Sequence, residues 1–127
     1  MKKELANKLY LRFPDIFIGC HKPLTESLMA FGIEVGDGWF DLIYEMCEEI
    51  ESIAILEDVP LPVAVQVKEK IGELRFYASG ATKNMFDCIE NTKDRSVEIC
   101  EICGKEGKLL TNKNRWMKTR CQKHETN

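Results

Sequence analysis

The sequence predicts an α+β protein: a small helical and β-hairpin domain followed by a C-terminal treble-clef-like or zinc-ribbon module. Apolar residues recur at helical spacing over residues 38–56 and alternate with polar residues over residues 63–78. Two Cys/His pairs then follow near the C-terminus. Because the two expected strands are neighbours and need no crossover helix, the pattern favours α+β over α/β. We expect one domain over residues 1–97 and a zinc-binding module over residues 98–127.

The chain begins with a short predicted helix over residues 2–12, with Leu5, Leu9 and Phe13 on one face. Pro14 ends this helix, because proline disfavours a helical conformation in the residue before it. Residues 14–38 are rich in glycine and proline and are expected to form loops, with one helical turn between residues 25 and 31.

The strongest helical pattern covers residues 38–56. Asp37 is the expected N-cap, and acidic residues near the start suit the positive end of the helix dipole. The carboxylates on this helix form a solvent-facing side and no catalytic arrangement. The expected inward stripe consists of Trp39, Leu42, Ile43, Met46, Cys47, Ile50, Ile53 and Ala54.

A β-hairpin is predicted over residues 63–78, with a turn at Ile71-Gly72-Glu73. A further helix is predicted over residues 82–97, with Met85, Phe86 and Ile89 pointing inward. One hairpin face is expected to carry Val63, Val65, Val67, Leu74 and Phe76, and the other Gln66, Lys68, Lys70, Arg75 and Tyr77.

The pairs Cys100-x-x-Cys103 and Cys121-x-x-His124 predict a site for one structural zinc ion. Gly104 permits the tight turn that lets both thiolates of the first pair face one ion. Unrelated buried cysteines and a redox C-x-x-C pair explain this spacing less well, because neither requires the second pair. Four strong ligands leave no open position, so the pattern favours a structural zinc over a catalytic one.

Composition and charge restrict the classes of function. The 127-residue chain has a net charge of −3, with an acidic body of −8 over residues 1–103 and a basic tail of +5 after them. No signal-peptide apolar run and no membrane-spanning stretch is present, so we expect a cytoplasmic protein without membrane contact. In that reducing compartment the six cysteines indicate ligands and buried thiols rather than disulfides.

The sequence contains two candidate binding surfaces, the polar face of the hairpin and the basic tail. The polar hairpin face is suited to an anionic, nucleotide-like ligand. Alternatively, it is a solvated strand surface whose lysines discourage aggregation. The basic tail is suited to nucleic acid, with Trp116 available for stacking or else serving as the hydrophobic centre of the zinc module. The candidate ligand residues are Gln66, Lys68, Lys70, Arg75 and Tyr77, and the candidate nucleic-acid residues are Lys113, Arg115, Trp116, Lys118 and Arg120.

The sequence contains no phosphate loop, nucleophile elbow or dinucleotide fingerprint, so we expect a non-catalytic protein. The chain contains only two histidines, so it offers few candidates for the general base of a catalytic set of nucleophile, base and orienting residue. A hydrolase using Cys20-His21 or the carboxylates is a third, lower-ranked hypothesis.

Three segments resemble an uncharacterised family of small proteins from bacteria and their phages. These are Phe31-Gly-Ile-Glu-Val-Gly-Asp-Gly-Trp-Phe40, Val67-Lys-Glu-Lys-Ile-Gly-Glu-Leu-Arg-Phe-Tyr77, and Cys100-x-x-Cys103-Gly104 with Trp116, Thr119, Cys121 and His124. The resemblance covers residues 28–124, with Ile71 where phenylalanine is expected. It implies a phage or prophage accessory protein in a bacterial cytoplasm, but no biochemical activity.

By analogy with phage accessory proteins, we expect a protein that binds a host protein or an anionic ligand and counteracts host defence. A nucleic-acid-binding regulator that acts through the basic zinc module is the alternative. The sequence leaves the ligand, the partner and the formation of a homo-oligomer open.

Overall fold

The computed structural model describes residues 1–125 and has the α+β architecture that the sequence predicts. Its helices are α1 (Lys3–Arg12), α2 (Phe40–Glu57) and α3 (Lys83–Ser96). One sheet contains β1 (Ile33–Glu34), β2 (Val63–Lys70) and β3 (Glu73–Ser79), and the other contains β4 (Lys108–Thr111) and β5 (Met117–Arg120). Short 3-10 turns are η1 (Ile18–His21), η2 (Leu28–Phe31), η3 (Asp37–Trp39) and η4 (Gln122–His124).

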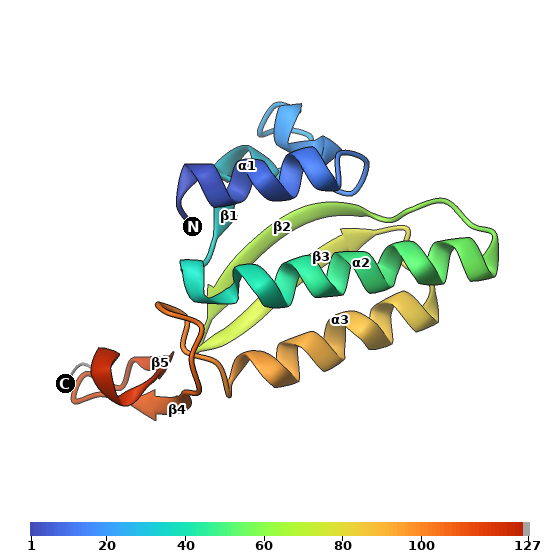
Figure 1. The fold of residues 1–127 in the computed structure, drawn as a ribbon. Helices are drawn as coiled ribbons and strands as arrows, with labels where there is room; N and C mark the ends of the chain where they lie inside the picture. The colour runs from blue at the N-terminus through green and yellow to red at the C-terminus, as the bar shows by residue number, and fades with distance from the viewer. Residues whose placement is uncertain (126–127) are drawn as a thin grey trace.

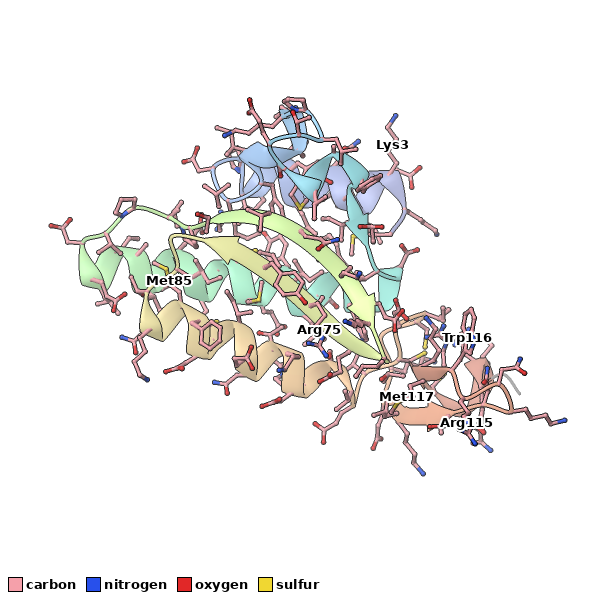
Figure 2. All side chains as sticks on the ribbon, turned by 180° about the vertical axis from the view of Figure 1, so that it is seen from behind. Lys3, Arg75, Met85, Arg115, Trp116 and Met117 are labelled. Carbon is pink, nitrogen blue, oxygen red and sulfur yellow. The ribbon has the colours of Figure 1, made fainter. Side chains whose placement is uncertain are left out.

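The first sheet has the order β1-β2-β3, with β1 parallel and β3 antiparallel to β2. Ile71 and Gly72 form the hairpin turn at φ 48° and 80°, as a two-residue turn between twisted strands requires. Figure 1 shows α2 and α3 side by side across one face of β2 and β3, with the small β4–β5 sheet beyond the start of α2. The opposite face of β2 and β3 is open in Figure 2.

The core lies between the helices and the first sheet. The stripe predicted on α2 is buried there, apart from the half-buried Ile53. Trp39 is completely buried at the start of this helix, and its Nε1 donates a hydrogen bond to the Ile99 carbonyl over 2.8 Å. Cys47 and Cys88 are buried thiols, as the helical spacing predicts. Within residues 1–125, no helix has the length and apolar character needed to cross a membrane.

Two predictions about the helices were wrong. Asp37 does not cap α2, because the 3-10 turn η3 precedes that helix and Trp39 occupies its N-cap position. The Asp37 carboxylate instead accepts a hydrogen bond from the Lys2 backbone N–H over 2.7 Å, at the start of α1. Phe86 is 55% exposed, because Met85, Cys88 and Ile89 form the inward stripe of α3.

The prediction for the inner hairpin face was wrong at its beginning. The register shifts between Ala64 and Gln66, where Val65 forms a β-bulge. An extra residue reverses the alternation of side chains, so Ala64 is buried while Val63 and Val65 are only half-buried. After the bulge, Val67 and Phe76 are paired and buried as predicted.

Candidate metal centre

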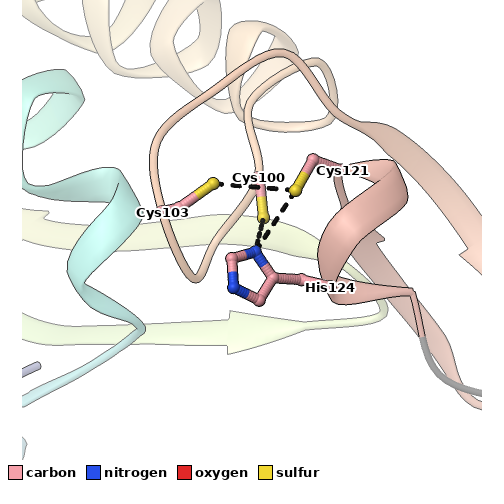
Figure 3. Close-up of side chains that lie close together, drawn as sticks. All are labelled: Cys100, Cys103, Cys121 and His124. Atoms are coloured by element: carbon pink, nitrogen blue, oxygen red, sulfur yellow. Dashed lines mark hydrogen bonds between the residues drawn. The ribbon is translucent and has the colours of Figure 1, made fainter.

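Cys100, Cys103, Cys121 and His124 form one compact cluster, in which all four ligand atoms lie within 4.8 Å of one another. Figure 3 shows their side chains pointing toward a common centre. The Cys103 and Cys121 sulfurs are 3.6 Å apart, and His124 Nδ1 lies 3.7 Å from the Cys100 sulfur and 3.2 Å from that of Cys121. A tetrahedral site with ordinary metal–sulfur and metal–nitrogen bonds has ligand separations of about 3.5–3.8 Å. The cluster is therefore able to hold one metal ion.

Local backbone geometry positions each ligand pair. After Cys100 the chain turns back on itself, so that the Gly104 N–H donates to the Cys100 carbonyl over 2.9 Å. Gly104 has φ 79°, a conformation that a side chain would strain. Cys121 follows β5 directly, and the η4 turn brings the His124 N–H within 3.0 Å of the Cys121 carbonyl.

The donor chemistry also fits a metal ion. All six cysteines are free thiols. Burial raises the pKa of Cys100, but hydrogen bonds from the backbone N–H groups of Cys103, Cys121 and Ile102 outweigh burial and lower this pKa to about 6. This favours the thiolate at Cys100, the form of cysteine that binds metals. A backbone hydrogen bond from Lys105 lowers the pKa of Cys103, but burial and the neighbouring thiols of Cys121 and Cys100 outweigh it and raise this pKa.

Glu101 connects the cluster to the main domain. Its carbonyl accepts the Gly38 N–H over 2.7 Å, and its buried carboxylate accepts the Gly36 N–H over 3.0 Å. The second oxygen of this carboxylate forms an ion pair with Arg120 at 3.0 Å. A Cβ atom on Gly38 would clash with the Cys100 carbonyl oxygen, so only glycine allows this approach. The metal loop is thus packed directly against the segment that precedes α2.

Strand β5 makes a second connection, to the tip of the β2–β3 hairpin. The Thr119 hydroxyl is buried and donates to the Gly72 carbonyl over 2.6 Å. Lys118 forms an ion pair with Glu69 at 2.6 Å, and the same carboxylate accepts the Gly72 N–H over 2.8 Å. The metal-binding segment therefore contacts both the start of α2 and the hairpin turn.

The candidate ligand residues lie on the open face of the first sheet. Lys68 is directly opposite Arg75, and Gln66 is opposite Tyr77, so these four side chains are neighbours. Lys70 is exposed at the end of the strand, opposite Glu73, which forms a 2.8 Å ion pair with Arg75. Figure 2 shows Arg75 beside β3, in the half of this strand nearer the hairpin turn.

The candidate nucleic-acid residues divide into two groups. Lys113, Arg115 and Trp116 are exposed around the β4–β5 turn, and Trp116 is 64% exposed. Trp116 is therefore not the hydrophobic centre of the module. Lys118 and Arg120 are instead engaged with Glu69 and Glu101, where carboxylates offset their charge.

Glu69 and Glu101, which hold the segment with the Cys/His cluster against the domain, were not predicted. A single acidic residue belongs to no recognisable motif or spacing, so the sequence alone does not identify either one. Gly36 and Gly38 did carry a signal, since two glycines flanking an aspartate before a helix indicate a close backbone approach.

No family model, curated protein or solved structure matches the chain significantly.

The packing of Gly38 generates a prediction about stability. Gly38→Ala should lower the free energy of unfolding of the metal-loaded protein by about 3 kcal/mol, because the methyl group separates Glu101 from the main domain. Gly80→Ala is the matched control: the added methyl group meets no atom within 4 Å, and the positive φ at this position should cost only about 1 kcal/mol. Urea denaturation of both variants measures the difference, and equal losses would contradict the assigned contact.

Proposed function

We propose that the cluster holds one structural zinc ion. The observation that carries this proposal is the closeness of three sulfurs and one imidazole nitrogen, all within 4.8 Å. Three thiolates and a histidine are a preferred ligand set for zinc, and four protein ligands close the tetrahedron against substrate. The chain's own ligands thus fill every position, which supports a stabilising role for the ion rather than a catalytic one.

The arrangement around the cluster supports a treble-clef-like module. A tight turn carries the first ligand pair, the β4–β5 hairpin follows, and Cys121 opens the 3-10 turn that carries His124. A zinc ribbon, the other expected architecture, would place the second pair in a further hairpin turn. A segment of this size buries too little surface to fold alone, so metal binding would supply much of its folding free energy.

For the protein as a whole, we propose a non-catalytic, zinc-stabilised accessory protein of phage or prophage type that counteracts host defence by binding. The open sheet face supports an anionic, nucleotide-like ligand as the bound species. Lys68 lies opposite Arg75 across two strands. Glu73 offsets part of the charge of Arg75, but among residues 1–125 no ion pair offsets that of Lys68, so its ammonium group is available to a bound anion. Tyr77 is 44% exposed beside them and offers a ring for stacking. A host protein with an acidic surface is the other ligand that this face suits.

Trp116 favours a second candidate function, the binding of single-stranded nucleic acid. Its exposed ring lies next to Arg115 and near Lys113, which leaves an aromatic surface flanked by cations. Such a combination stacks on bases and contacts phosphates. The pairing of Lys118 and Arg120 with carboxylates reduces the number of cations available, which is why this candidate ranks second.

Metal analysis tests the zinc proposal. Freshly purified protein should contain about one equivalent of zinc. Cys103→Ser should lose most of it to a chelator and should lower the free energy of unfolding by about 3 kcal/mol, because a stabilising ligand of the folded state is lost. Cys20→Ser changes a half-buried thiol outside the cluster and should retain the metal. Zinc-free wild-type protein, or equal retention by both variants, would refute the proposal.

Absorbance tests the anionic ligand. If the ligand is a nucleotide, protein purified from bacteria should show excess absorbance at 260 nm. Lys68→Ala or Arg75→Ala should weaken nucleotide binding by about 10- to 100-fold, since each variant lacks one charge-assisted hydrogen bond to the ligand. Lys3→Ala, an exposed change on α1, is the charge-matched control. A normal spectrum, together with no binding of added nucleotides, would rule out this ligand class.

Salt dependence tests the nucleic-acid candidate. Binding of a single-stranded oligonucleotide, followed by fluorescence polarisation, should weaken on Trp116→Ala by about 1–3 kcal/mol. Arg115→Ala should reduce the slope of log affinity against log salt by about 0.7, the contribution of one phosphate contact. Lys22→Ala, an exposed change in the N-terminal loop, should alter neither quantity. Equal effects of Lys22→Ala and Arg115→Ala would indicate only unspecific attraction.

A further inference from the structure

The last turns of α2 expose two consecutive large apolar side chains. Ile55 is 80% exposed and Leu56 is 85% exposed. A single exposed leucine is ordinary on a protein surface, but adjoining apolar residues beside surface hollows indicate a contact site. Figure 1 places this end of α2 at the opposite end of the molecule from the β4–β5 sheet, so it is separate from the metal centre.

Two hollows lie on either side of this pair of residues. One has a volume of about 320 Å³ between α2 and α3, and Ile53, Leu56 and Cys88 supply its apolar lining. The other has a volume of about 530 Å³ where the chain leaves α2, and its apolar lining consists of Ala54, Ile55, Val59 and Leu61. We call Ile55, Leu56 and the two hollows the α2-end surface.

The rim of the α2-end surface is acidic. Five carboxylates line the two hollows: Glu49, Glu51, Glu57, Asp58 and Asp87. Arg12 and Lys83 form ion pairs with Glu51 and Asp87. Among residues 1–125 no ion pair offsets the charge of Glu49, Glu57 or Asp58, and Glu57 accepts only the neutral donors Thr82 and Asn84.

The negative charge of this rim indicates what kind of partner can bind to the α2-end surface. Two copies of the chain that met through this surface by two-fold symmetry would bring the same acidic rims together, and that contact is unfavourable. A basic segment is attracted instead. The lining residues place the two hollows on opposite flanks of α2, so the ridge between them is about 10 Å wide. Side chains two turns apart on one face of a bound helix span about that distance.

We propose that the α2-end surface binds a basic amphipathic helix of another protein. Apolar side chains of that helix enter the two hollows on either side of Ile55 and Leu56. Its Lys and Arg residues face Glu49, Glu57 and Asp58. The interaction is independent of the open sheet face and of the metal centre, so its failure in a test would leave the function proposed above intact.

A designed peptide tests the proposal with the full-length, metal-loaded protein. The probe is a fluorescent helix of about 15 Leu and Lys residues with one apolar face. Anisotropy should show binding that falls by about tenfold or more in the Ile55→Glu/Leu56→Glu variant, whose changes at exposed positions leave the fold intact. Leu24→Glu, at a residue 52% exposed in the N-terminal loop, should bind as wild type does.

Charge reversal separates recognition from unspecific attraction. Glu49→Lys and Glu48→Lys alter the net charge equally, but only Glu49 lines a hollow. Glu49→Lys should weaken peptide binding several-fold more than Glu48→Lys, and a peptide of Leu and Glu should not bind. The proposal is overturned if the two variants bind equally, if the Leu/Lys peptide does not bind wild type, or if wild type self-associates through Ile55 and Leu56.

Discussion

The backbone of Gly36 and Gly38 lies directly against the loop that begins at Cys100, and this contact joins the Cys/His cluster to the main domain. Two backbone N–H groups donate to Glu101 across this contact, and the absence of a Cβ atom on Gly38 makes the approach sterically allowed. Cys100 and Cys103 of the cluster lie on either side of Glu101 in the chain. A metal ion bound by them would therefore also fix the acceptors that hold the start of α2.

Three segments of the chain, residues 31–40, 67–77 and 100–124, are in contact with one another. Residues 31–40 meet the metal loop through Gly36 and Gly38, and residues 67–77 meet β5 through Glu69 and Gly72. The third segment contains the metal ligands. One interface thus brings together glycines, charged residues and cysteines that are far apart in the sequence, and the open sheet face and the end of α2 lie outside it.

Local patterns were sufficient to predict the helices, the hairpin and the gathering of three cysteines and one histidine into a cluster. The stripe from Leu42 to Ala54 repeats with helical period, and the spacing of the four metal ligands restricts them to few geometries. Features set by tertiary contacts were not predictable. The pairing of β1 with β2 joins residues far apart in the chain, the bulge at Val65 leaves no mark in the alternation, and the pairing of Arg120 with Glu101 depends on how the module is packed.

Hydrogen exchange of individual backbone amides, compared between metal-loaded and metal-stripped protein, measures whether a bound ion holds the cluster against the main domain. The amides of Gly36, Gly38 and Gly72 should be protected when the metal is bound and should exchange much faster after its removal, while the amide of Ile50 in the core stays protected. Unchanged protection at these three glycines after metal removal would contradict the account, because the interface would then form without the ion.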